Sequence, residues 1–174
     1  MGELAPDFSL ISTSGETVTL KQFRGKIVVL EWFNPDCPFV KVAHNEGKVG
    51  KQAADHIAQG GVWLAINSGG KGMQGHGKER NAQAVTEYGL SHPVLLDEDG
   101  AVGKQYNALK TPHMYVIDAQ GKLVYQGALD STGGQGYTKE FTPHLQNALA
   151  AVRAGKAPEK AAVRPWGCGV KYAR

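Results

Sequence analysis

The chain has 174 residues, 41% of them hydrophobic and 20% charged, which is an ordinary composition for one globular domain with a sizeable core. A net charge of +3 with scattered lysines argues against nucleic-acid binding, and no apolar run approaches the roughly 20 residues that span a bilayer. Two cysteines are too few for a disulfide scaffold, although they permit one bridge.

Turn signals divide the chain into alternating strands and helices. Ser14-Gly15-Glu16 predicts the turn of an N-terminal hairpin, and Ala119-Gln120-Gly121 predicts a second tight turn between two strands. We expect strands at 8–11, 17–20, 26–33, 62–67, 93–97, 113–118 and 122–126. We expect helical segments at 21–25, from 38 to about 47, at 51–58 and 78–88, from about 101 to 106, and from 142 to about 154.

This order of elements predicts an α/β fold with a central mixed β-sheet flanked by helices. Alternating strands and helices pair in parallel, whereas a hairpin adds an antiparallel pair. We expect one domain over residues 1–155, followed by a C-terminal extension, 156–174, that carries Cys168 and shows little regular pattern. The glycine-rich segment 68–77 lacks the ending of a phosphate-binding loop, and we expect it to form a mobile rim.

The N-terminus leaves the cellular compartment open. Met1-Gly2-Glu3 leads directly into Leu4-Ala5-Pro6-Asp7-Phe8 with no visible signal peptide. Two interpretations remain: a cytoplasmic protein, or a mature bacterial chain exported to the periplasm, with Met1 added in place of its signal peptide.

Cys37 lies where a buried strand is predicted to end and a helix to begin. Lys26-Ile27-Val28-Val29-Leu30 is a β-branched apolar run, and Pro38 suits the first position of a helix. A thiol at that point feels the positive end of the helix dipole and free backbone N–H groups, which favour the reactive thiolate. The pattern therefore predicts a redox nucleophile at Cys37.

Three further residues could serve this thiol. Glu31 lies inside the apolar run, where burial would raise its pKa toward neutrality and let it move protons to and from Cys37; the alternative is a solvent-facing carboxylate. Pro112, directly before a strand, is a candidate cis-proline. Cys168 lies between two glycines and is the second sulfur that thiol–disulfide exchange requires.

Four segments together resemble the thioredoxin-fold redoxins of the alkyl-hydroperoxide-reductase and thiol-specific-antioxidant group, which includes the peroxiredoxins. They are Ala5-Pro6-Asp7-Phe8, the strand leading to Cys37, Thr111-Pro112-His113 and the hairpin at 116–121. The resemblance spans about residues 3–150. It implies a thioredoxin-like fold without a cofactor, with Cys37 as nucleophile and Glu31 as the buried acid. It also implies that Pro112 packs beside the active sulfur and that the backbone near Thr111 helps to hold a substrate disulfide.

The chain departs from both better-known chemistries of this group. Thioredoxins carry Cys-x-x-Cys, but Val40 stands where the resolving cysteine would be. Peroxiredoxins carry a proline seven residues and a threonine three residues before the active cysteine, and here those positions hold Leu30 and Asn34. The most similar redoxin-domain proteins share Asn-Pro-Asp-Cys-Pro-Phe-Val and a late Gly-Cys-x-Val-Lys-Tyr.

The sequence therefore predicts a thiol–disulfide oxidoreductase in which Cys37 attacks and Cys168 is the candidate resolving cysteine. One alternative is a thiol peroxidase, in which Cys168 captures a sulfenic acid at Cys37. The other is a non-enzymatic binding or metal-handling domain, with Cys37, His76 and His113 as ligands. Expected partners are protein or small-molecule thiols, disulfides or hydroperoxides, and an external reductant such as a thioredoxin-like protein. The remaining histidines are expected at the surface or at helix caps: His44, His56, His92 and His144.

Overall fold

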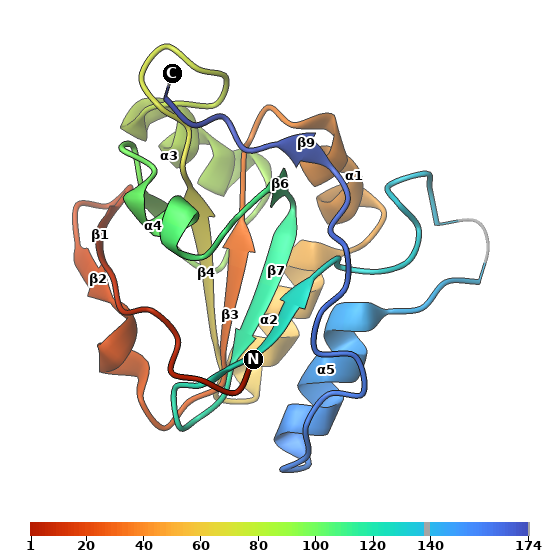
Figure 1. Ribbon diagram of the computed structural model, residues 1–174. Coiled ribbons are helices and arrows are strands. Elements are labelled where there is room, and N and C mark those ends of the chain that lie inside the picture. Colours follow the sequence, from red (N-terminus) through yellow and green to blue (C-terminus); the bar gives the residue numbers. More distant parts are fainter. Residues whose placement is uncertain (138–139, 174) are drawn as a thin grey trace.

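The computed structural model describes residues 1–137 and 140–173 (Figure 1), so the extension is described up to residue 173. The strands are β1 (Ser9–Ser12), β2 (Thr17–Thr19), β3 (Val28–Trp32), β4 (Val62–Asn67), β5 (Val94–Leu96), β6 (Lys110–Thr111), β7 (His113–Ile117), β8 (Leu123–Gly127) and β9 (Cys168–Gly169). The helical segments are η1 (Leu20–Phe23), α1 (Pro38–Asn45), α2 (Val49–Ala58), α3 (Lys78–Glu87), α4 (Ala101–Gln105) and α5 (His144–Arg153). The predicted elements are thus present, with ends shifted by a few residues.

A seven-stranded mixed sheet forms the centre, in the order β2-β1-β5-β4-β3-β7-β8. The central strand β3 pairs in parallel with β4 and antiparallel with β7. Every residue of β3 and of β7 is buried, as expected of strands covered on both faces. The predicted mixed sheet, flanking helices and N-terminal hairpin are confirmed. The hairpin also joins the main sheet, because β1 pairs antiparallel with β5.

Alternate side chains of β3 point to opposite faces of the sheet and nucleate two cores. Leu30 and Trp32 pack with the N-terminal hairpin and α4. Val29 packs on the other face with residues of α1, α2 and α5. The carboxyl end of β3 thus leads into α1 at the edge where β6 and β9 lie (Figure 1).

The glycine-rich segment 68–77, which the sequence predicts to be a mobile rim, is held by hydrogen bonds at both ends. Two buried asparagines flank it: Asn67 at the end of β4 and Asn81 in α3. Asn67 Nδ2 donates to the Gly75 carbonyl at 2.8 Å, and Asn81 Nδ2 donates to the carbonyls of Gly75 and Gly77 at 2.9 and 2.8 Å. The two amides also bond to each other, so the loop is fastened to its flanking elements.

The C-terminal extension is more ordered than its sequence pattern indicates. Its β9 pairs antiparallel with β6, which sets Thr111 opposite Cys168 and Lys110 opposite Gly169. In Figure 1 the extension runs from the far end of α5 back past β8 and across the top of the sheet. This pairing brings the two cysteine segments together from distant parts of the chain.

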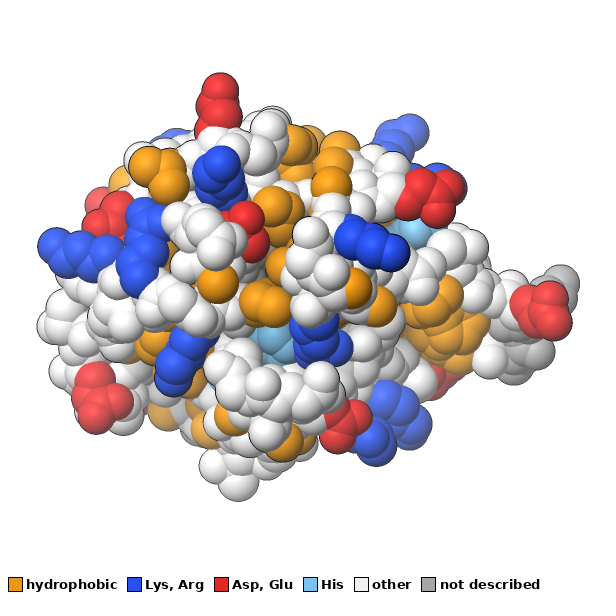
Figure 2. All heavy atoms as spheres, turned by 90° about the horizontal axis from the view of Figure 1, so that it is seen from below, with side chains coloured by type: hydrophobic (Ala, Val, Ile, Leu, Met, Phe, Trp, Pro, Cys, Tyr) orange, Lys and Arg blue, Asp and Glu red, His pale blue; other side chains and the backbone are white. Residues whose placement is uncertain are grey.

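The surface agrees with the mild net charge. On the face shown in Figure 2, Lys and Arg side chains are interspersed with Asp and Glu, with hydrophobic side chains between them. Within 1–137 and 140–173, no helix is long and apolar enough to cross a membrane.

Candidate redox site

Cys37 is the N-cap residue of α1, with Pro38 at the first helical position, as the sequence predicts. Its side chain is completely buried. The Cys37 carbonyl accepts the N–H of Lys41, which begins the helix, and the thiol donates to the Thr111 carbonyl at 3.2 Å. A sulfur at a helix N-terminus is stabilised as thiolate by the helix dipole and the free N–H groups of the first turn.

The segment before Cys37 is clamped by α3, which sequence reasoning did not connect with the site. Arg80 donates from Nε to Asp36 at 2.9 Å and forms an ion pair with the same carboxylate at 2.8 Å. Tyr88 donates its hydroxyl to the Pro35 carbonyl at 2.8 Å. Arg80 therefore offsets the negative charge next to Cys37. No local motif signals this contact, because the two segments lie far apart in the sequence.

Thr111 and Pro112 face the sulfur. The Thr111–Pro112 peptide bond is cis in the structure. Thr111 is 2% exposed, and its carbonyl accepts the Cys37 thiol while its hydroxyl has no hydrogen-bond partner. The structure thus brings Thr111, Pro112 and Cys37 together.

Cys168 lies close to Cys37 and Thr111. It is half-buried, stands opposite Thr111 in the β6–β9 pair, and packs against the cluster that contains Cys37. Both cysteines are free thiols. Burial and the adjacent Cys37 thiol raise the pKa of Cys168 to about 11. The two sulfurs are therefore neighbours with different electrostatic surroundings.

Glu31 is fully buried, but its pKa does not rise as the sequence indicated. Burial alone would raise the pKa, yet His44, through its charge and hydrogen bond, together with the hydrogen bond of Trp63 and the nearby His92, lowers the pKa below the ordinary value. His44 Nε2 lies 2.7 Å from Glu31 Oε1, and Trp63 Nε1 donates to Oε2 at 3.1 Å. Both oxygens are thus directed to α1 and β4, and neither is hydrogen-bonded to Cys37.

The expectation that the histidines lie at the surface or at helix caps is wrong for His44, His56 and His92, which are buried and are not helix caps. The tertiary fold covers them, which their isolated positions in the sequence could not indicate. Burial lowers the pKa of His92 to about 4 and that of His113 to about 4, so both rings are neutral at pH 7.

The residues considered as metal ligands do not converge. His76 bonds through Nδ1 to the Gly69 carbonyl, and His113 bonds to the Tyr115 hydroxyl. Among the residues that the structure describes, no three His, Cys, Asp or Glu side chains are grouped to hold a metal ion. The metal-handling alternative therefore has no ligand set here.

A buried cysteine at a helix start, facing a cis-proline segment at the end of a central strand, defines a redox protein of the thioredoxin-like fold. Residues 1–126 match the model of the AhpC/TSA family, and the chain belongs to that family.

Three relatives illustrate the similarity. The chain is 31% identical over 124 residues to the thioredoxin-like protein YneN of Bacillus subtilis, which covers 70% of this chain and 68% of YneN. It is 26% identical over 146 residues to the thiol-disulfide oxidoreductase ResA of Bacillus thuringiensis, which covers 82% of this chain and 79% of ResA. A crystal structure of the hypothetical protein SMc02350 from Sinorhizobium meliloti superposes with a TM-score of 0.89 at 31% identity, covering 99% of this chain and 94% of that one.

Proposed function

We propose that this protein is a thiol–disulfide oxidoreductase in which Cys37 is the nucleophile and Cys168 the resolving cysteine. The observation that carries the proposal is the β6–β9 pair, which sets Cys168 opposite the residue whose carbonyl accepts the Cys37 thiol. The name of the ResA relative supports disulfide exchange as the reaction.

The steps follow from the two environments. The Cys37 thiolate attacks one sulfur of a substrate disulfide, and the other substrate sulfur leaves as a thiolate and takes up a proton. Cys168 then loses its proton and attacks the Cys37 sulfur of the mixed disulfide, which releases the second substrate thiol and forms a Cys37–Cys168 disulfide. An external dithiol, such as that of a thioredoxin-like protein, reduces this disulfide and is itself oxidised.

The surrounding residues hold the nucleophile. The Thr111 carbonyl fixes the Cys37 sulfur at 3.2 Å, and Pro112 shapes the wall beside it. Glu31 acts as a positioning residue: through His44 it fastens the inner face of α1, whose first turn stabilises the thiolate. In this proposal Glu31 positions α1, and it does not transfer protons directly to Cys37 as the sequence indicated.

The thiol-peroxidase alternative has less support. Asn34 stands at the position of the peroxiredoxin threonine. Its side chain accepts the Asp36 N–H at 2.9 Å and donates to the Gln74 carbonyl at 3.2 Å. We expect Cys37 to react with hydrogen peroxide no faster than an unactivated thiolate, as measured by stopped-flow. A rate many orders of magnitude higher would favour the peroxidase.

A two-variant experiment tests the roles. With dithiothreitol as electron donor and insulin as substrate, Cys37→Ser should lower the rate of disulfide reduction to the uncatalysed background. Cys168→Ser should retain the first attack and accumulate a mixed disulfide at Cys37, which peptide mapping by mass spectrometry detects. Wild-type activity in Cys37→Ser, or a mixed disulfide found on Cys168 instead, would contradict the assignment.

A further inference from the structure

Residues 161–173, here called the strap, form a single extended segment across the redox site. Near their start, the Gln126 N–H donates to Ala161 at 2.9 Å and the Val163 N–H donates to Gln126 at 3.0 Å. In the middle, β9 pairs with β6, and the Val170 N–H donates to Leu109 at 3.2 Å. At the end, the Gly70 N–H donates to Lys171, and the Tyr172 hydroxyl donates to Ala108, both at 2.8 Å.

The strap closes the site. Cys37 has no exposed surface, whereas Cys168, on the strap, is half-buried. Trp166 adds a second cover, because its ring centroid lies 6.2 Å from that of Phe39 in the first turn of α1. Thiol–disulfide exchange requires an attacking thiolate with access to the disulfide sulfur. In this closed arrangement, a substrate disulfide does not reach Cys37.

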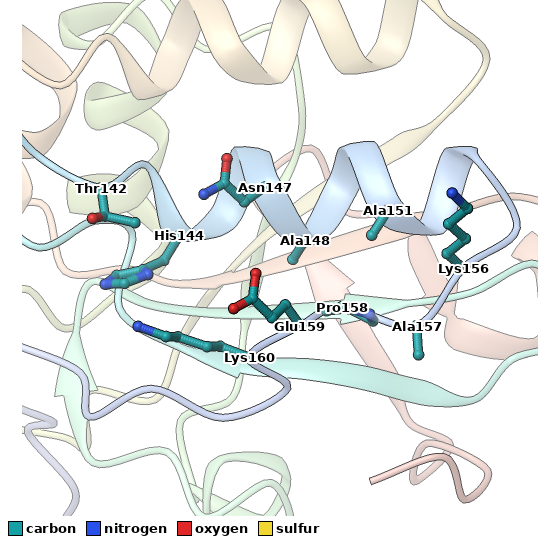
Figure 3. Close-up of a pocket in the computed structure, with 10 residues that line it drawn as sticks. All are labelled: Thr142, His144, Asn147, Ala148, Ala151, Lys156, Ala157, Pro158, Glu159 and Lys160. Carbon is teal, nitrogen blue, oxygen red and sulfur yellow. The ribbon is translucent and has the colours of Figure 1, made fainter.

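Besides its hydrogen bonds, the strap is held by four side chains that are only half-buried against the cores: Val163, Trp166, Cys168 and Val170. None of residues 159–173 is buried, so the strap adds no fully buried side chain to the core. Two hollows lie beside residues 156–167. A pocket of about 460 Å³ separates α5 from residues 156–160, just before the strap (Figure 3). Another, of about 440 Å³, is lined by strap residues 163–167 together with Lys110 and Asp130. A segment without a fully buried side chain opens locally at a lower cost in free energy than a core strand.

We propose that the strap is a gate that competes with the substrate for the β6 edge. It lifts to admit the substrate to Cys37, and its return expels the substrate while it delivers Cys168. This deepens the proposed function and rests on it. The return step is balanced: the Cys168 thiolate bonds to the Cys37 sulfur, the mixed disulfide breaks, and the substrate sulfur leaves as a thiolate that takes up a proton. The resulting Cys37–Cys168 disulfide then ties the strap down until an external dithiol reduces it.

The chain offers a matched pair of glycines to test the gate. Gly167 has φ of +123°, and a Cβ there would clash with the Thr111 carbonyl oxygen. Gly169, two residues on, would place a Cβ in open space. Gly167→Ala should therefore lift the strap from β6 without replacing either cysteine, and Gly169→Ala should leave it closed.

The first measurement is the access of a small reagent to Cys37. In a Cys168→Ser background, we expect iodoacetamide to label Cys37 about tenfold faster when Gly167→Ala is added, and within about twofold of the background for Gly169→Ala. Equal rates for the two alanine variants would overturn the gate. Labelling needs no turnover, so it stays informative even if the reductase activity fails its own test.

The second measurement separates opening from delivery. With both cysteines present, dithiobis(nitrobenzoate) releases one thionitrobenzoate when Cys37 attacks and a second when Cys168 resolves the mixed disulfide. Gly167→Ala should accelerate the first release and slow the second, whereas a generally loosened protein accelerates both, which would contradict the proposal.

Hydrogen exchange of the wild-type protein gives a test that needs no variant. The amides of Val163 and Val170 should exchange about a hundredfold faster than those of Val29 and Val116 in the central strands. Equal protection of strap and core amides would mean that the strap does not open by itself, and the proposal would fail.

Discussion

At the residue scale, both cysteines lie against the backbone of Thr111, but their electrostatic surroundings differ. Cys37 begins a helix, whose dipole and N–H groups stabilise a negative sulfur. Cys168 lies on a short strand, where burial and the adjacent Cys37 thiol raise its pKa to about 11. This asymmetry favours attack by Cys37 first. It also lets Cys168 remain protonated until the mixed disulfide has formed.

The buried pair of Glu31 and His44 makes a prediction about stability. His44→Leu leaves the Glu31 carboxylate buried without its hydrogen-bond partner, and we expect a loss of about 3–5 kcal/mol in the free energy of unfolding. Glu31→Gln keeps a hydrogen-bond acceptor for Trp63 but removes the charge. In that background, His44→Leu should cost at least about 2 kcal/mol less.

Urea unfolding of the four proteins of this cycle at pH 7 measures the coupling. The direction in which stability changes with pH follows from the lowered pKa of Glu31, which His44 keeps low against the effect of burial. The pair stabilises the fold fully above the unfolded pKa of the carboxyl, and this contribution is lost as pH falls through the lower, folded value. The same cost for His44→Leu in both backgrounds would show that the two residues do not act as a pair.

The sequence predicted where these residues lie better than what surrounds them. The apolar run before Cys37 and the proline after it are local signals, and they located the helix start correctly. The pKa of Glu31 could not be predicted in the same way, because His44 comes from the next helix and its burial depends on tertiary packing. The ion pair of Arg80 with Asp36 was not predicted for the same reason, because the two residues meet only through tertiary packing.

At the scale of elements too, features with a local sequence signal were predicted, and features that depend on tertiary packing were not. Strand β3 and the break between α1 and α2 follow from local patterns, an apolar run and the helix-breaking residue Gly47. The pairs β1–β5 and β6–β9 join segments that are distant in the sequence. A two-residue strand such as β9 has no periodicity to detect. Pairing of such strands is determined by the packed core, which positions both edges.

The loop at 68–77 gives a prediction at this scale. Asn81 is completely buried and makes three hydrogen bonds that join α3 to this loop and to Asn67. Asn81→Ala removes these three buried hydrogen bonds, and we expect it to cost about 1–3 kcal/mol. Asn147→Ala, on the exposed side of α5, is the matched control and should be nearly neutral.

Urea unfolding gives the change in stability, and hydrogen exchange reports where it acts. The Asn81 variant should lose protection at His76 and Met73, whose amides are bonded within the loop, before it loses protection in the central strands. Uniform loss throughout the molecule would mean that the loop is not fastened separately.

At the scale of the whole molecule, burial of neutral histidines couples stability to pH. His92 and His113 are 5% and 3% exposed, and burial lowers the pKa of each to about 4 from an ordinary 6.5. Below pH 6.5 the unfolded chain therefore binds protons that the folded chain does not. The free energy of unfolding should decrease as pH falls from 6.5 toward 4, by roughly 3 kcal/mol for each residue.

A variant at His92 isolates one half of this effect. Both ring nitrogens of His92 are buried without hydrogen-bond partners, so His92→Leu removes two unpaired polar atoms as well as the titrating group. We expect the variant to be at least as stable as the wild type at pH 7. Between pH 6.5 and 4, the slope of its free energy of unfolding against pH should be smaller by the equivalent of about one proton. Urea unfolding at half-unit steps of pH measures this slope. The half-buried His144, replaced in the same way, should change the slope less, because less burial acts on its pKa. An unchanged slope in His92→Leu would show that His92 takes up its proton while the protein remains folded.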